Sequence, residues 1–319
     1  MEGVNKRKKI LITGVGGPAG INISRLFKDR EDVEVLGCDS DDTASGQIFT
    51  DRFLVCPLAT DGSYKNWTKD IVRSEKIDLL IPTVGEELLI LARFIDELPT
   101  SVMVSSVETL QTLDDKLMAY NFVADNLPQY CPEFVSLSQW TESWTESESF
   151  FIKPRRGRGS RGCRIVSFGE LAWIKENISN PEDYIVMENL IGTEWTVDAY
   201  VANNGSIAYL VPRERLALSG GISVKGRTIK NEEVIDATKL LLSKLPSKGP
   251  VCVQWKADST GKPKFIEMNP RLSGGLMISV GAGIDPVGAI LSDLNKEAVV
   301  YQDWKEVTVV GHTDYNFLR

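Results

Sequence analysis

The sequence contains a single histidine, His312, which follows the short apolar run "VTVVG" near the end of the chain. Catalytic triads, histidine metal sites and histidine-based hydride transfer all need at least one well-placed imidazole. We therefore expect none of these three kinds of site. We interpret His312 as a surface residue at the end of a strand.

Cysteine pairs and long apolar runs are missing as well. The five cysteines lie far apart with no Cys-x-x-Cys pair, which is typical of reduced thiols. No apolar run approaches the length that spans a bilayer. The basic start of the chain has too short an apolar core for a signal peptide and leads directly into a glycine turn. We expect a cytoplasmic protein with no membrane partner.

Basic residues are fewer than acidic ones: the chain has 36 Lys and Arg and 44 Asp and Glu, which gives a net charge of −8. Phosphate backbones select for positively charged proteins, so we expect no nucleic-acid partner. The 319 residues are enough for two or three domains, each with its own core.

The pattern of apolar residues divides the chain near residue 107. Before it, short apolar runs alternate with amphipathic segments, which predicts a parallel sheet with helices on both faces. A helix is expected next, capped by Asp114 and ending before Pro128. From Phe150 onward, strands alternate apolar and polar residues, which suits antiparallel sheets with one covered face. We therefore expect an α/β domain at 1–106 and an α+β domain at 107–319.

A glycine-rich turn follows the first predicted strand, in "KKILITGVGGPAGINISRLF" (8–27), and Asp39 closes the next apolar run. A strand, a glycine turn, a helix and a later acid are typical of dinucleotide-binding domains. The turn also opens a helix, and helix N-termini favour anions, which makes Gly16 and Gly17 candidate contacts for a substrate anion. The alternative is that the glycines only permit the tight turn.

A predicted hairpin, "VCVQWKADSTGKPKFIEMNPRLSGG" (251–275), carries oxygen-bearing side chains. If its turn centres on Thr260 and Gly261, Gln254 lies opposite Glu267, and Asn269 shares the face of Glu267. Carboxylate and amide oxygens suit Mg²⁺. Arg271, just beyond, could stabilise charge on a transferring phosphoryl group. The alternative is an ordinary solvated strand face.

Two further segments suggest nucleotide chemistry. In "FFIKPRRGRGSRGCRIV" (150–166), Lys153 ends a strand and a glycine-rich loop follows whose amides could face phosphates. The alternatives are a mobile basic loop or an RNA contact. In "IVMENLIGTEWTVDAY" (185–200), Glu188 and Glu194 could bind an adenine amino group and ribose hydroxyls. A solvated hairpin face is the competing interpretation.

The order of "DDKL", "FIKP" with its glycine loop, "MENLIGTE" and "VQW…FIEMNPR" resembles the ATP-grasp superfamily. The likeness is to carbamoyl-phosphate-synthetase large-subunit-like carboxylate-amine ligases and covers nearly the whole chain. It implies a Rossmann-like pre-ATP-grasp domain, then an ATP-grasp domain in which 148–192 forms a lid-like subdomain. A full synthetase has two such halves and a glutamine-hydrolysing partner, so we do not expect carbamoyl phosphate synthesis itself.

The resemblance implies roles for particular residues. ATP would be bound by Lys116, Lys153, Gly159, Ser160, Gly162, Glu188, Asn189, Leu190 and Glu194. The metal would be held by Gln254, Glu267 and Asn269, and the catalytic residues would be Arg271 and Lys153. The substrate candidates, besides the two glycines of the first turn, are Arg213, Arg215 and Lys225 in the segment 211–230.

The function that the resemblance implies is ATP-dependent ligation. MgATP would activate a carboxylate as an acyl-phosphate, and an amine would then displace phosphate, with ADP as the other product. The cofactors would be ATP and Mg²⁺, with Mn²⁺ as an alternative metal, and the partners a small carboxylate and a small amine. A homodimer is left open. The competing hypotheses are an NAD-dependent oxidoreductase built on the glycine turn and a non-catalytic nucleotide-binding protein.

Overall fold

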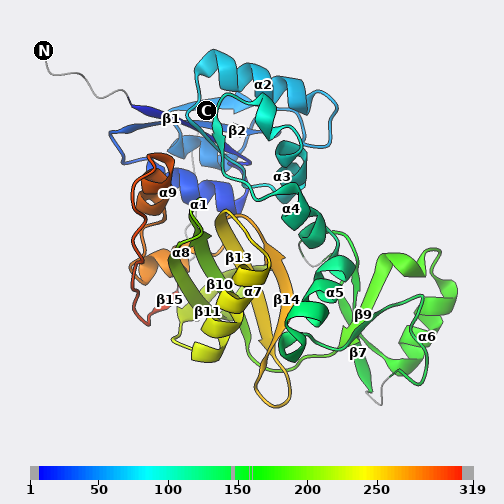
Figure 1. Cartoon of the computed structure of the whole chain (residues 1–319). Coiled ribbons are helices and arrows are strands. Elements are labelled where there is room, and N and C mark those ends of the chain that lie inside the picture. Colours follow the sequence, from blue (N-terminus) through cyan, green and yellow to red (C-terminus); the bar gives the residue numbers. More distant parts are fainter. Residues whose placement is uncertain (1–6, 145–147, 158, 160, 311–319) are drawn as a thin grey trace, which may run out of the picture.

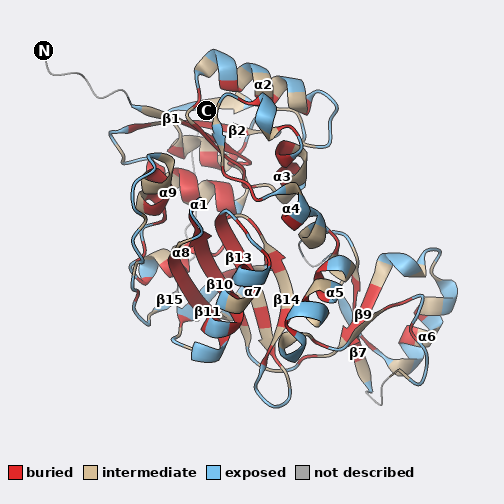
Figure 2. Ribbon diagram, in the orientation of Figure 1, coloured by how far each residue is buried: buried red, intermediate tan, exposed pale blue. Residues whose placement is uncertain are grey.

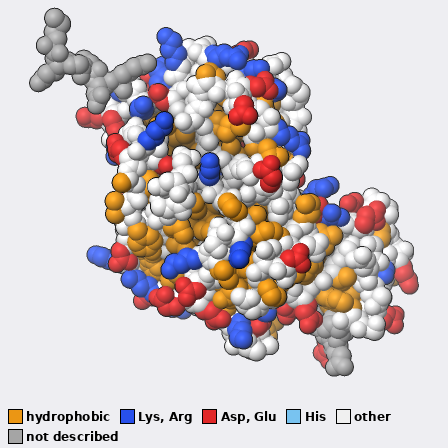
Figure 3. Space-filling model, in the orientation of Figure 1, with side chains coloured by type: hydrophobic (Ala, Val, Ile, Leu, Met, Phe, Trp, Pro, Cys, Tyr) orange, Lys and Arg blue, Asp and Glu red, His pale blue; other side chains and the backbone are white. Residues whose placement is uncertain are grey.

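The structure, a computed structural model, describes residues 7–144, 148–157, 159 and 161–310. It contains one parallel sheet and two antiparallel sheets (Figure 1). Within the described part of the chain, no helix is long and apolar enough to cross a membrane. All five cysteines are free thiols. Basic and acidic side chains are intermixed on the face shown in Figure 3, without a large patch of one sign.

The N-terminal sheet is parallel, with the strand order β3-β2-β1-β4-β5. Its strands are β1 (Lys8–Thr13), β2 (Val33–Asp39), β3 (Arg52–Val55), β4 (Leu79–Ile81) and β5 (Ser101–Val102). The helices of this part are α1 (Pro18–Phe27), α2 (Tyr64–Glu75), α3 (Gly85–Ala92) and α4 (Val107–Asp114). Short 3₁₀ helices lie at Ser45–Phe49, Ile95–Glu97, Pro128–Tyr130 and Pro181–Asp183.

Alternate residues of β1 pack on opposite faces of the parallel sheet. Ile10 and Ile12 belong to the core that includes Ile23 of α1, whereas Leu11 packs in a separate cluster with Val72 of α2. Strands that are covered on both faces read as continuous apolar runs, as "KILIT" does. The predicted parallel sheet with helices on both sides is confirmed.

Helix α5 (Lys116–Asn126) leads from the N-terminal part to a four-stranded antiparallel sheet at one side of the molecule (Figure 1). The order of this sheet is β6-β9-β7-β8, and helix α6 (Phe168–Asn177) packs on it. The strands are β6 (Phe134–Ser136), β7 (Ser149–Pro154), β8 (Arg164–Ser167) and β9 (Tyr184–Glu188).

The expected cap of a helix at Asp114 is wrong by one residue. Asp114 ends α4, and Asp115 caps α5 by accepting hydrogen bonds from the backbone N–H groups of Leu117 and Met118. Two adjacent aspartates are equally good capping residues, and no proline or glycine marks the break between the helices. The end of α5 before Pro128 is as predicted.

The largest sheet is antiparallel and has the order β14-β13-β10-β11-β12-β15. Its strands are β10 (Glu194–Val201), β11 (Ile207–Ser219), β12 (Ile222–Thr228), β13 (Gly249–Ala257), β14 (Pro263–Asn269) and β15 (Thr308–Val310). Its strands are largely buried (Figure 2), and α7 (Glu232–Lys244) packs on it through a hydrogen bond of 2.9 Å between Trp255 and Thr238. Helices α8 (Leu276–Gly281) and α9 (Pro286–Leu294) lie between β14 and β15 in the chain.

A β-bulge in β14 sets which side chains reach the open face of this sheet. Near the tip, Trp255 of β13 pairs with Phe265, but the next residue of β13, Gln254, pairs with Glu267. Ile266 is therefore the extra residue, and it reverses the alternation of β14 beyond that point. Phe265 and Met268 consequently both belong to the core, while Ile266 and Glu267 both line a cavity.

Candidate active site

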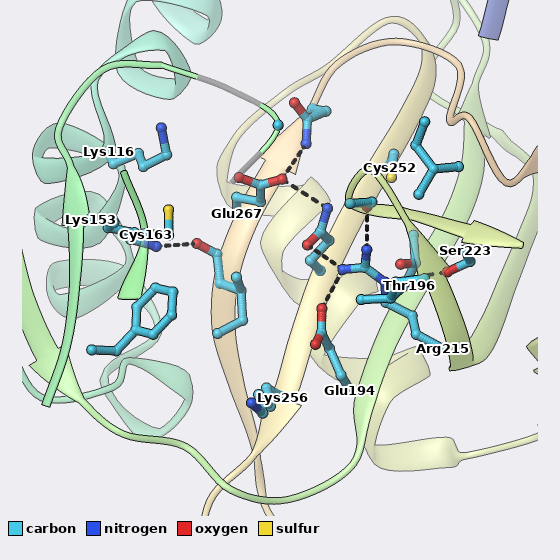
Figure 4. Close-up of a pocket in the computed structure, with 18 of the residues that line it drawn as sticks. Lys116, Lys153, Cys163, Glu194, Thr196, Arg215, Ser223, Cys252, Lys256 and Glu267 are labelled. Atoms are coloured by element: carbon cyan, nitrogen blue, oxygen red, sulfur yellow. Dashed lines mark hydrogen bonds and ion pairs between the residues drawn. The ribbon is translucent and has the colours of Figure 1, made fainter. Parts of the chain in front are cut away.

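A cavity of 510 Å³ lies between the four-stranded sheet and the open face of the six-stranded sheet. Figure 4 shows Lys116 and Lys153 on one side of Glu267, and Arg215 with Glu194 on the other. Most of the residues that the sequence singles out line it: Lys116, Lys153, Gly159, Glu188, Asn189, Leu190, Glu194, Arg213, Arg215, Gln254, Glu267, Asn269 and Arg271. Elements that are distant in the chain thus meet in one pocket.

Glu267 is the centre of a polar patch that the hairpin builds. Its Oε1 atom accepts a hydrogen bond of 2.8 Å from the side-chain amide of Gln254 and one of 2.9 Å from that of Asn269. The expected pairing of Gln254 with Glu267 is confirmed. The oxygen of the Gln254 amide in turn accepts a hydrogen bond of 3.1 Å from Arg215.

This patch fits a cation that the protein shares with a phosphate ligand. Within the described residues, no group of three or more acidic, histidine or cysteine side chains could hold a metal ion. Glu267 supplies one carboxylate, and Asn269, whose NH2 group donates a hydrogen bond to that carboxylate, carries an amide oxygen as a second candidate ligand. Mg²⁺ is commonly bound by one or two carboxylates while substrate phosphates and waters complete its shell. Gln254 acts here as a bridge between Arg215 and Glu267.

Lys153 is buried in the cavity wall, with 3% of its surface exposed. Its ammonium group donates a hydrogen bond of 2.6 Å to the hydroxyl of Tyr120 and one of 3.3 Å to the carbonyl of Ile266. Burial lowers the pKa of Lys153 to about 8, against the opposing effect of Glu267. The bulge thus directs a backbone carbonyl at a lysine that needs acceptors.

The glycine-rich loop after β7 is tied to the start of α5. Lys116 donates a hydrogen bond of 2.6 Å to the carbonyl of Gly157, and Arg155 forms an ion pair with Asp115 at 2.7 Å. Gly157, Gly159 and Gly162 have φ values of 124°, 66° and 74°, which side chains with a Cβ rarely adopt. A Cβ at Gly162 would lie 3.0 Å from the ring of Pro154, and Gly162 does not line the cavity. Ser160 lies outside the described residues.

The strand β9 and the connection to β10 carry the residues that the sequence singles out as candidate nucleotide contacts, and these residues line the cavity. Glu188 accepts a hydrogen bond of 3.0 Å from the backbone N–H of Glu133, which fixes its carboxylate. Asn189 donates to the hydroxyl of Ser149 at 3.1 Å, and Leu190 is buried. Glu194 forms an ion pair with Arg215.

Arg213 is a buried arginine with an incomplete set of partners. Its Nε atom donates to Asp198 at 2.8 Å and its Nη2 atom to Ser273 at 3.2 Å. Its Nη1 atom is buried and has no hydrogen-bond partner in the described part of the chain. Its guanidinium lies so close to Gly275 that a Cβ there would be 2.8 Å from Nη2. Lys225, by contrast, is exposed on β12 and does not line the cavity.

At the glycine turn of the N-terminal sheet, a side chain of the same domain takes up a backbone N–H group that could have bound a ligand. The N–H of Gly16 donates to Asp39 at 2.8 Å, and neither Gly16 nor Gly17 lines the cavity. In such sheets ligands bind where the strand order reverses, which is here between β1 and β4. That position holds the buried carboxylate of Glu87, which accepts hydrogen bonds from Thr13 and Tyr64. The arrangement does not favour a dinucleotide.

Several residues that line the cavity were not singled out from the sequence. They are Cys163, Ser223, Cys252, Lys256 and Ser273, and behind them lies Tyr120. Alternation along β13 could have indicated Cys252 and Lys256, because each shares the face of Gln254. Tyr120 has no comparable signal, since its role depends on how α5 packs against β14.

Two family models match separate parts of the chain. Residues 180–314 match the family model described as "ATP-grasp in the biosynthetic pathway with Ter operon". Residues 10–104 match the model described as "PylC-like, N-terminal domain". A search of curated proteins found no matching sequence.

Solved structures share the fold at low sequence identity. The N5-carboxyaminoimidazole synthetase of Staphylococcus aureus, complexed with ADP, is 15% identical with a TM-score of 0.73, over 93% of this chain and 79% of that one. The L-amino acid ligase of Bacillus licheniformis is 15% identical with a TM-score of 0.70, and the match covers 91% of this chain and 74% of that one. A third structure is the biotin carboxylase domain of the Hydrogenobacter thermophilus 2-oxoglutarate carboxylase, a dimer in complex with MgADP, ADP and bicarbonate. It is 15% identical with a TM-score of 0.76, and the match covers 94% of this chain and 72% of that one.

Proposed function

We propose that this chain, whose residues 180–314 match an ATP-grasp family model, is an ADP-forming ligase that joins a small carboxylic acid to an amine. The observation that carries the proposal is the convergence of Lys116, Lys153 and the Glu267 patch on one cavity. Two lysines beside a single carboxylate suit a nucleoside triphosphate that binds together with a divalent cation.

The nucleotide would lie along the length of the cavity. Glu188, with its carboxylate held by the backbone of Glu133, and the backbone at Asn189 and Leu190 would bind the adenine. Lys153 and Lys116 would hold the phosphates, and the loop that contains Gly157 and Gly159 would cover them. Glu194 is the candidate for the ribose hydroxyls, with Arg215 fixing its orientation.

Mg²⁺ would bind at Glu267 and Asn269, where it would neutralise charge on the β- and γ-phosphates. Mn²⁺ is the alternative metal that we propose for the same ligands. Arg271 lines the cavity next to these residues. We assign it to the charge that develops on the transferring phosphoryl group and on the acyl-phosphate.

In the first reaction a carboxylate oxygen of the acid attacks the γ-phosphorus, and the bond to the bridging oxygen of ADP breaks. In the second the amine nitrogen attacks the acyl carbon, loses a proton and displaces phosphate. Neither reaction requires a histidine, because positioning and electrostatic stabilisation account for most of such catalysis. A covered cavity also protects the acyl-phosphate from water.

The decisive experiment is hydroxylamine trapping with MgATP and a panel of small carboxylic and amino acids, with hydroxamate and ADP both measured. Formation of both with one class of acid supports the ligase and identifies the acid. Nucleotide binding without ADP release would instead support a non-catalytic nucleotide-binding protein. Binding of NAD without binding of ATP would support the oxidoreductase.

A further inference from the structure

A second, smaller cavity of 90 Å³ adjoins the first at the metal patch. It lies between the helices α3 and α4 of the N-terminal part and the end of β14, elements that Figure 1 shows meeting above the hairpin. Six residues line both cavities: Lys116, Gly157, Gly159, Glu267, Asn269 and Arg271. The two cavities therefore share the wall at which phosphoryl transfer would take place.

Five apolar side chains line the small cavity and not the large one. They are Leu88 and Leu89 of α3, Leu110 and Leu113 of α4, and Met268. Leu88, Leu110 and Met268 are buried, so their side chains are held in place by packing. Polar side chains form much of the remaining lining: Lys116, Glu267, Asn269 and Arg271, which also line the large cavity, and Asp114.

We propose that this cavity receives the short aliphatic chain of the acid, whose carboxylate lies at Arg271. The inference rests on the proposed function, which places a carboxylate beside the γ-phosphate. An acid in this orientation directs its reacting oxygen into the large cavity and its hydrocarbon chain toward the four leucines. Burial of that chain is favourable, whereas a charged group placed among the leucines would lose its hydration without finding a partner.

The size of the cavity limits the length of the chain. A volume of 90 Å³ is about three times the roughly 30 Å³ that one water occupies in the liquid. The cavity therefore suits an aliphatic group of roughly three to five non-hydrogen atoms. We expect unbranched acids of this length to be better substrates than acetate, and better than amino acids or dicarboxylic acids of equal length.

The test is the chain-length profile of kcat/KM in the hydroxamate assay. The acids are acetate to octanoate, with glycine and succinate as polar comparisons. Leu113→Ala should move the optimum to longer acids and change the ratio of long to short acids by about tenfold or more, because pockets discriminate one methylene by 10–200-fold. Leu113→Phe should exclude the longer acids.

Leu117→Ala is the matched control. Leu117 is a half-buried leucine four residues further on that lines neither cavity, so its loss should leave the profile unchanged. A profile that is the same in wild type, Leu113→Ala and Leu113→Phe would overturn the inference and leave the ligase intact, as would a preference for glycine or succinate. Failure of every acid to release ADP would reject the proposed function, and the inference with it.

Discussion

Lys153 is an ionisable side chain in an almost completely buried position. It is 3% exposed, and its acceptors are one hydroxyl and one carbonyl. A lysine whose pKa is lowered to about 8 is charged below that pH and becomes neutral above it. A neutral amine attracts phosphate only weakly, so nucleotide binding by the free enzyme should depend on pH within the accessible range.

We expect kcat/KM for ATP to fall as pH rises above about 8. Lys153→Arg should remove this decline, because arginine stays charged throughout the range. Tyr120→Phe should move the decline to lower pH, because it removes the hydroxyl that accepts a hydrogen bond from the charged lysine at 2.6 Å. The measurement is a pH profile from 6 to 10 for the three proteins. An identical decline in Lys153→Arg would assign it to another group.

Glu267→Gln tests the metal patch. Turnover should fall by at least about 100-fold, the usual cost of removing a group that stabilises transition-state charge. The variant retains an acceptor oxygen for Gln254 and Asn269, so the free energy of unfolding should change by less than about 1 kcal/mol. Turnover and urea unfolding are measured on the same preparation. Loss of the fold would show that Glu267 is structural.

The residues that the sequence identified well are those whose position follows from alternation along one strand or hairpin. Glu267 and Asn269 were placed on one face, opposite Gln254, and lie there. The ion pair of Glu194 with Arg215 was not predicted, because it depends on the pairing of β10 with β11. The contact of Lys153 with Tyr120 depends on packing between elements 33 residues apart.

At the level of elements, Asp115 connects a helix terminus to the loop that would cover the phosphates. It caps α5 and accepts hydrogen bonds from Arg155 at 2.7 and 2.8 Å and from Arg156 at 3.2 Å, with 3% of its side chain exposed. These contacts fix the first residues of the loop, Arg155 and Arg156, to the start of α5.

Asp115→Asn and Asp115→Ala separate these two roles. Asparagine is as good a capping residue as aspartate but cannot form the ion pair, whereas alanine loses both. We expect the alanine variant to unfold with a free energy about 1 kcal/mol lower than the asparagine variant, and both to lie below wild type. Urea titrations at pH 7 measure the difference. Equal stability of the two variants would mean that the cap contributes nothing.

The strands and helices of the N-terminal sheet were predictable because each carries its own apolar run or amphipathic pattern. The side-chain contacts that fill the end of this sheet were not predictable. Asp39 has the position of a dinucleotide-binding acid, yet it accepts from the N–H of Gly16. Glu87 belongs to a helix whose pattern gave no indication that this carboxylate would be buried under Thr13 and Tyr64.

For the whole molecule, Glu87 makes stability depend on pH. Burial raises the pKa of its carboxyl, although hydrogen bonds from Thr13 and Tyr64 oppose the shift. A raised native pKa stabilises the fold below the unfolded value of about 4.5, and this contribution is lost as pH rises through the native pKa. Each unit of the shift corresponds to about 1.4 kcal/mol.

Glu87→Gln should therefore gain stability relative to wild type as the pH is raised from 4.5 to 8. The free energy of unfolding of both proteins, measured in urea across this range, gives the difference directly. Glu86→Gln, one residue earlier and exposed, is the control for the loss of one carboxylate from the same helix. A flat difference for Glu87→Gln would mean that Glu87 titrates in the native protein as it does in the unfolded chain.

The regular alternation of β14 beyond the bulge at Ile266 limits how this hairpin can change in length during evolution. Residues can be inserted into the exposed turn at 258–262 without altering which face each side chain of β14 occupies. Loss of Met268, in contrast, would make Glu267 and Asn269 adjacent and so place them on opposite faces of the sheet, with one of them turned under α7. Related chains should therefore differ in length at the turn and keep these two polar residues two positions apart.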